Sequence, residues 1–171
     1  MSQKSFRNDV LPLKDILFRL ALRITKGRET AEDVVQETLI KVWNKRDDWQ
    51  NIDSMEAFCL TVCRNIAVDH TRKRGADSLS YEESEEAMRK DYGPDPYEKT
   101  SQNDRIAWIR RLVDELPEKQ RSCIQLRDFE EKSYKDIAAI MNISEESVKV
   151  NIFRARQTIK QRIQETDDYG L

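Results

Sequence analysis

Basic and apolar side chains near the C-terminus are spaced as in a helix that contacts nucleic acid. Five bases and no acid lie between Lys149 and Ile163. Their cationic groups can neutralise phosphates, and the first turns of a helix in the major groove reach base edges. The alternative is a solvated basic face on an ordinary bundle helix. Lys149, Val150 and Arg154 are predicted nearest the bases, Phe153 on the same exposed surface, and Arg156 and Lys160 nearer the phosphates.

A second group of the same chemistry lies at residues 65–74. Asn65 can both donate and accept hydrogen bonds, so it could hold a base edge. Arg72, Lys73 and Arg74 follow about two helical turns later and could neutralise phosphates. Cations at a helix C-terminus also complement the helix dipole, so a purely structural role is equally compatible with this pattern.

An acidic and polar ridge precedes both basic groups. Asp33, Gln36 and Glu37 are spaced i, i+3 and i+4, which puts them on one face of a helix. Their charge disfavours DNA and suits a basic protein surface. A solvated face is the simpler alternative when the ridge is considered alone.

Residues for catalysis or metal binding are few. His70 is the single histidine, and no Gly-rich phosphate loop, HExxH or CxxC motif is present. Cys59 and Cys63 could share a helix face and form a metal site with His70, but a fourth ligand is not evident. Buried apolar thiols are the favoured interpretation. No metal, cofactor or catalytic residue is expected, and a small metal-dependent enzyme remains an alternative.

The elements that must position these groups all show helical periodicity. Only 4 Gly and 4 Pro occur in 171 residues, and charged residues make up 36%, which favours helices over strands. In the first half we predict a helix over residues 12–26. A second helix is predicted to begin at Thr30, which opens a capping box. A third is predicted to run from a cap at Asp53 or Ser54 to Arg74.

The second half repeats this helical periodicity after a break. Apolar stripes cover Ile106–Leu116 and Cys123–Phe129. Ser133 then caps a short helix ending at Met141, Asn142 suits the left-handed position of a turn, and Ser144 caps the last helix. A short helix, a tight turn and a longer helix predict a helix-turn-helix.

Charge divides the chain into three parts. Residues 1–74 carry 14 bases and 11 acids, residues 75–100 carry 3 and 8, and residues 101–171 carry 13 of each. The middle part also lacks periodicity. We therefore predict an all-α protein with a helical domain over 1–74, a flexible acidic linker over 75–100, and a four-helix domain over 101–171 that ends in the helix-turn-helix.

The expected location is the cytoplasm. No stretch approaches the ~18 apolar residues of a membrane span, and the first residues lack the apolar core of a secretory signal. Three cysteines cannot all pair within one chain, so reduced thiols are expected. Neither membrane insertion nor secretion is predicted.

Four motifs in order resemble bacterial RNA polymerase sigma factors of the extracytoplasmic-function branch. Residues 31–43 resemble the AEDxxQExFxxxW signature of the second conserved region. Residues 62–74 resemble its IARNxxxDxxR segment, residues 116–121 the LPxxxR opening of the fourth region, and residues 134–156 its helix-turn-helix.

The resemblance implies roles for the candidate residues. It implies that Asp33, Gln36 and Glu37 dock on core RNA polymerase. It also implies that Asn65 and the following basic helix end read the minus-ten element of promoter DNA, and that the last helix reads the minus-thirty-five element. Such proteins are commonly held inactive by an anti-sigma protein, so that partner is expected too. The runner-up function is a stand-alone helix-turn-helix regulator, which would leave the ridge and the Asn65 segment unexplained.

Overall fold

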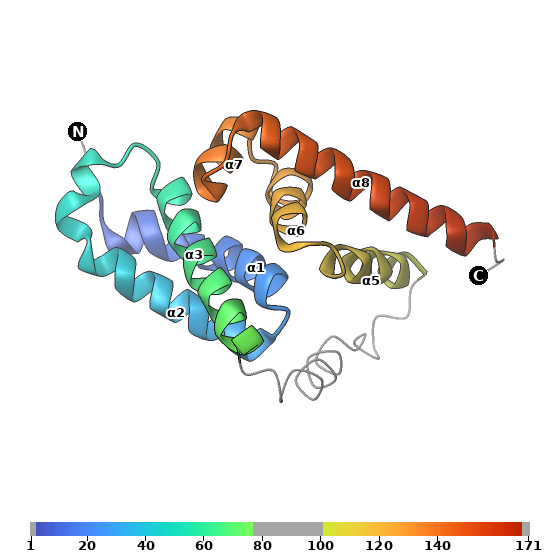
Figure 1. Cartoon of the computed structure of the whole chain (residues 1–171). Helices are drawn as coiled ribbons and strands as arrows, with labels where there is room; N and C mark the ends of the chain where they lie inside the picture. The colour runs from blue at the N-terminus through green and yellow to red at the C-terminus, as the bar shows by residue number, and fades with distance from the viewer. Residues whose placement is uncertain (1–2, 77–100, 169–171) are drawn as a thin grey trace. The chain divides into compact units, whose positions relative to one another are not determined.

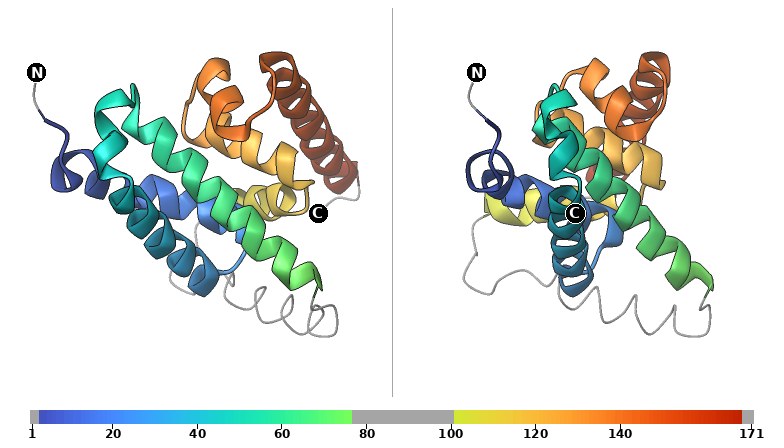
Figure 2. Two further views of the ribbon diagram at one scale, coloured as in Figure 1. Left: turned by 60° about the vertical axis from the view of Figure 1, so that its left-hand side comes forward. Right: turned by 90° about the vertical axis from the view of Figure 1, so that its left-hand side faces the viewer.

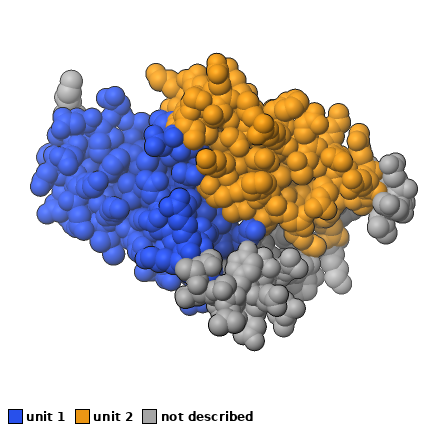
Figure 3. Space-filling model, in the orientation of Figure 1, with its two compact units in different colours: residues 1–91, 139–142 blue, residues 92–138, 143–171 orange. Residues whose placement is uncertain are grey.

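The computed structural model describes residues 3–76 and 101–168, and the regular elements within these ranges are all helical (Figure 1). The contacts divide the chain into two compact units, shown in Figure 3: residues 1–91 with 139–142, and residues 92–138 with 143–171. The predicted all-α fold is confirmed. The predicted linker lies almost entirely outside the described residues, except that the last helix of the first block continues to Ala76.

Three helices form the body of the first unit (Figure 2). They are α1 (Lys14–Thr25), α2 (Arg28–Asn44) and α3 (Met55–Ala76), and each packs against the other two. Short helical turns precede α1 at Phe6–Val10 and Leu11–Leu13, and another, η3 (Arg46–Asn51), separates α2 from α3. The fully buried side chains of this core include Leu17, Leu20, Ile24, Val34, Val42 and Leu60.

The start of α2 differs from the sequence-based prediction. The helix begins at Arg28, with Gly27 as its cap, so the predicted capping box at Thr30 is wrong. Thr30 is instead buried inside the first turn, where its Oγ1 accepts a hydrogen bond from Arg74 on α3. A tertiary partner for the hydroxyl therefore replaces the local cap. The preceding helix α1 ends at Thr25, and its C-cap residue Lys26 takes a left-handed φ of 65°.

Residues 101–168 form the remaining elements. They are α5 (Ser101–Asp114), α6 (Glu118–Ile124), the wider π-helical turn η4 (Gln125–Phe129), α7 (Tyr134–Met141) and α8 (Glu145–Asp168). Val113, Leu116, Ile124 and Ala155 make a buried cluster. Buried Arg121 supports this packing, because its Nη1 donates to the carbonyl of Leu116 at 2.7 Å near the end of α5. The predicted helix over Cys123–Phe129 is α-helical only as far as Ile124 and widens into the π-helical turn η4 from Gln125.

The predicted helix-turn-helix is present. The Oγ of Ser133 accepts from the backbone N–H of Asp136 at 3.1 Å, and the Oγ of Ser144 accepts from that of Ser147 at 3.1 Å. Both serines therefore cap the helices that follow them, as expected. Asn142 has a φ of 54°, so it supplies the left-handed turn between α7 and α8.

Candidate nucleic-acid interface and docking ridge

The two faces of α8 are separated as the sequence predicts. Val148, Ile152 and Ala155 are buried, and Ile159 and Ile163 are partly buried further along the same stripe. The opposite face is open to solvent. Phe153 is 62% exposed and Val150 45% exposed, which is unusual for such large apolar side chains. The exposed predicted contacts on α8 are Lys149, Val150, Phe153, Arg154, Arg156 and Lys160.

Arg156 has a partner within the chain. Its Nη2 and Nε approach the two carboxylate oxygens of Asp128 on η4, at 2.5 and 3.2 Å. This fork-to-fork hydrogen bonding raises the pKa of Arg156, which stays charged in any case. The guanidinium therefore ties the middle of α8 to η4, a contact between residues 28 apart in sequence. Sequence periodicity could not identify this acid.

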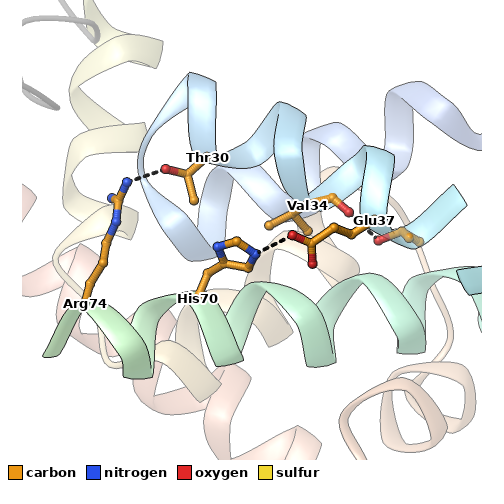
Figure 4. Close-up of polar contacts among 6 residues, drawn as sticks. Thr30, Val34, Glu37, His70 and Arg74 are labelled. Atoms are coloured by element: carbon orange, nitrogen blue, oxygen red, sulfur yellow. Dashed lines mark hydrogen bonds and ion pairs between the residues drawn. The ribbon is translucent and has the colours of Figure 1, made fainter. Parts of the chain in front are cut away.

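The candidate face on α3 is also accessible, with one of its bases engaged. Asn65, Arg72 and Lys73 are exposed. Arg74 reaches back to Thr30 on α2, as Figure 4 shows. The amide of Asn65 and the two cations that follow it thus present donors to solvent, while Arg74 also fastens the end of α3 to the start of α2.

The acidic and polar ridge forms a continuous surface on α2. Asp33, Gln36 and Glu37 are all exposed. The Oε1 atom of Glu37 lies 3.1 Å from Nε2 of His70 on α3 (Figure 4). His70 thus orients the Glu37 carboxylate. This pairing was not predicted from the sequence. Asp33 and Gln36 extend the same surface toward the start of α2.

Two apolar residues on α2 extend this surface beyond the predicted set. Ile40 is 62% exposed and lies seven residues after Asp33, which places it on the same helix face. Trp43 is 45% exposed, and its ring contacts that of the buried Trp49 edge to face. The indole N–H of Trp49 donates to the carbonyl of Val42 at 3.0 Å. Ile40 falls outside the apolar stripe, so its angular position could have identified it.

In this structure the three cysteines are buried, and His70 pairs with Glu37. Across residues 3–76 and 101–168, no group of three or more His, Cys, Asp or Glu side chains is placed to hold a metal ion. Cys59, Cys63 and His70 therefore do not form the alternative metal site. Cys59, Cys63 and Cys123 are free and fully buried, and the thiol of Cys63 contacts the carbonyl oxygen of Leu17 at 3.4 Å.

Burial should make these thiols unreactive in the folded protein. It raises the pKa of Cys59 from 9.0 to about 11 and that of Cys63 to about 12. Because the thiolate is the nucleophile, we expect iodoacetamide at pH 8 to leave both residues unmodified until urea unfolds the chain. Intact-mass analysis measures this directly. Rapid alkylation of the folded chain at either position would contradict the assignment.

The same shifts predict a loss of stability at high pH. A raised folded-state pKa stabilises the fold while the unfolded thiol is still protonated, below about pH 9. As pH rises from about 9 toward 11–12, unfolded thiols ionise before folded ones, so the free energy of unfolding falls. Urea titrations should show that the free energy of unfolding falls less between pH 8 and pH 10 for Cys63→Ala than for wild type. If it falls equally in both proteins, ionisation of the Cys63 thiol is not the cause.

Within the described residues, none of the helices combines the length and the apolar character needed to cross a membrane. The longest of them, α8, carries charged side chains along most of its length.

Two family models match the chain in the order of its two helical blocks. Residues 10–76 match Sigma-70 region 2, and residues 106–159 match Sigma-70, region 4. The first match covers the ridge and the Asn65 segment, and the second covers the helix-turn-helix. A stand-alone helix-turn-helix regulator is therefore disfavoured, because it would account for the second match alone.

Similar proteins agree with these matches. The RNA polymerase sigma-H factor of Pseudomonas aeruginosa is 27% identical over 172 residues, covering 95% of this chain and 88% of that protein. The ECF RNA polymerase sigma factor SigE of Mycolicibacterium smegmatis is 29% identical over 153 residues, covering 85% and 56%. The ECF RNA polymerase sigma factor SigM of Bacillus subtilis is 26% identical over 144 residues, covering 84% and 86%.

Solved structures show the same architecture. The sigma factor RpoE of Bartonella quintana, crystallised with the anti-sigma factor NepR, superposes with a TM-score of 0.73 at 25% identity, covering 93% of this chain and 96% of that one. CnrH, solved with the cytosolic domain of CnrY, has a TM-score of 0.67 at 21% identity, covering 96% and 90%, and supports the fold. The chain belongs to the sigma-70 family, as an RNA polymerase sigma factor of the extracytoplasmic-function type.

Proposed function

We propose that this sigma factor docks on core RNA polymerase through Asp33, Gln36 and Glu37 and reads promoter DNA with two separate surfaces. The observation that supports the proposal is that each of the two matched family regions carries an exposed set of the candidate residues. Residues 1–74 form the docking and minus-ten domain, and residues 101–171 form the minus-thirty-five domain. Residues 75–100 are the acidic linker between them.

The minus-thirty-five element is read as duplex by α8. Lys149, Val150 and Arg154 face base edges, with the ring of Phe153 on the same exposed surface. A guanidinium that contacts guanine O6 and N7 discriminates between bases, whereas a cation on a phosphate adds affinity without sequence information. Lys160 has the second role, and Arg156 contacts phosphate while its pairing with Asp128 holds it in place.

The minus-ten element is read where the duplex opens. Extruding a base costs a few kcal/mol, which contacts to the flipped base must offset. The exposed amide of Asn65 can pair with the edge of such a base, and Arg72, Lys73 and Arg74 lie beside it as phosphate contacts. Opening becomes favourable only when polymerase and both DNA surfaces act together.

The protein acts as a binding subunit, with no catalytic role of its own, in the cytoplasm where core polymerase works. The ridge on α2 and the apolar surface of α8 are the parts that an inhibitor would have to cover. Because the similar sigma factor RpoE was solved with an anti-sigma factor, we propose that a partner of this class also regulates this chain.

The Arg154→Ala variant tests the minus-thirty-five assignment. We expect holoenzyme carrying it to bind promoter DNA about 1–3 kcal/mol more weakly, with relaxed preference at one base position, since a base contact is lost. Arg110→Ala on α5 removes a guanidinium that is also exposed and serves as the matched control. Footprinting and equilibrium binding measure the effect, and an unchanged footprint and affinity for Arg154→Ala would refute this role.

A further inference from the structure

His70 on α3 contacts the acidic ridge of α2, although it was not among the residues predicted to touch polymerase or DNA (Figure 4). Its Nε2 lies 3.1 Å from Oε1 of Glu37, and the two residues are 33 apart in sequence. An ionised carboxylate can only accept a hydrogen bond, so the imidazole nitrogen carries the hydrogen and donates it. His70 is the single histidine of the chain, which makes it a clean target for substitution.

The two partners in this contact are not equally constrained. The side chain of His70 is 29% exposed, whereas that of Glu37 is 53% exposed. Arg74, about one helical turn further along α3, donates to Thr30 near the start of α2. These two contacts tie α3 to α2 on either side of the fully buried Val34. The imidazole is therefore the better fixed partner, and the contact decides where the carboxylate points.

A glutamate without such a contact would sample many orientations. Its side chain has three torsions, and ordering a long side chain at an interface costs conformational entropy that subtracts from the binding free energy. The hydrogen bond to His70 restricts these torsions before a partner binds, so less entropy is lost on docking. The contact uses Oε1, so Oε2 can accept from a lysine or arginine of the partner.

We infer that His70 is a positioning residue for polymerase docking, which orients the Glu37 carboxylate so that its second oxygen accepts from a cation of core RNA polymerase. The inference rests on the proposed docking function of the ridge and adds a residue of α3 to that function. The role requires a hydrogen-bond donor at the position of Nε2 and requires no positive charge.

Competition for a limiting amount of core RNA polymerase tests this role. Fluorescein-labelled wild-type chain is bound to the polymerase and displaced by unlabelled variants, and anisotropy gives their relative Kd values. We expect His70→Leu to bind about three- to tenfold more weakly, since the carboxylate is no longer oriented before docking. His70→Gln should bind within about twofold of wild type, because its amide N–H reaches as far as Nε2 and can still donate.

A double-mutant cycle separates positioning from a general effect on the fold. In a Glu37→Ala background, His70→Leu should cause no further loss of affinity, because the group that it orients is absent. Equal losses in the two backgrounds would overturn the inference, and so would wild-type affinity for a folded His70→Leu variant. Circular dichroism establishes that each variant is folded.

His70→Asn gives the same test if His70→Leu does not fold. The asparagine amide is one methylene shorter than that of glutamine, so it keeps a polar group at this position but does not reach the carboxylate. We expect it to bind about three- to tenfold more weakly than wild type, like His70→Leu. Binding as tight as that of His70→Gln would refute the positioning role.

Arg28→Leu is the matched control, because it breaks a different ion pair of α2. Nε of Arg28 lies 3.7 Å from Oε1 of Glu32, which is not part of the ridge. This variant should compete as wild type does. A loss equal to that of His70→Leu would show that any disturbance of α2 weakens docking, which would overturn the inference.

The failure of this inference and that of the proposed function can be told apart in the same assay. If Asp33→Ala/Gln36→Ala competes poorly while His70→Leu competes as wild type does, only the role of His70 is refuted. If Asp33→Ala/Gln36→Ala competes as well as wild type, the proposed docking surface fails, whatever the His70 variants show.

Discussion

Replacing Asp33 and Gln36 together with alanine is expected to weaken binding to core RNA polymerase by about 2–4 kcal/mol, or roughly 30- to 1,000-fold in Kd. Both side chains are exposed on α2, so their loss should leave the helical core intact. The effect is large because a charged group on polymerase would keep its desolvation cost after losing its partner. Capture of core polymerase on immobilised sigma factor measures it.

A matched control is available in the same unit. Asp47 and Gln50 on η3 are the same residue types at the same spacing, and both are exposed. Asp47→Ala/Gln50→Ala should therefore capture core polymerase as wild type does. The docking assignment is wrong if the Asp33→Ala/Gln36→Ala variant binds as tightly as this control.

Leu20→Ala is expected to lower the free energy of unfolding of the first unit by about 2–5 kcal/mol. Leu20 on α1 is fully buried in the three-helix core. Truncation removes apolar contacts and leaves a cavity that the surrounding helices can only partly fill. Since domains of this size have only about 5–15 kcal/mol of stability, the variant should be partly unfolded at modest denaturant concentrations.

Urea unfolding followed by circular dichroism measures this loss, with Leu11→Ala as the control. Leu11 is 42% exposed, so its truncation should change the midpoint little. If Leu20→Ala unfolds at the same midpoint as the control, the three-helix core does not depend on this position in the way that its burial indicates.

Periodicity and local capping allowed much of the fold to be predicted from sequence. The apolar spacing fixed the helices, and Ser54, Ser133 and Ser144 each cap a helix as expected. Thr30 was misassigned because its local pattern suits a cap equally well, and only the tertiary hydrogen bond from Arg74 decides between the two. The widening at Gln125 likewise leaves no signal in an apolar stripe.

The candidate sites were predictable only where one helix face supplies them. Val150 and Phe153 were placed on the solvent side of α8 by angle alone, and the structure agrees. The partners Asp128 for Arg156 and Glu37 for His70 come from segments 28 and 33 residues away. No helical period connects such positions, so these contacts required the packed structure.

The central claim is that this chain directs polymerase to promoters, and in vitro transcription tests it most directly. The purified chain, freed of any bound inhibitor, is combined with core RNA polymerase and genomic fragments, and the 5′ ends of the transcripts are mapped. We predict discrete start sites that share sequence elements near minus ten and minus thirty-five and that are lost with Asp33→Ala/Gln36→Ala. If the mapped transcripts are the same with and without the protein, the claim is contradicted.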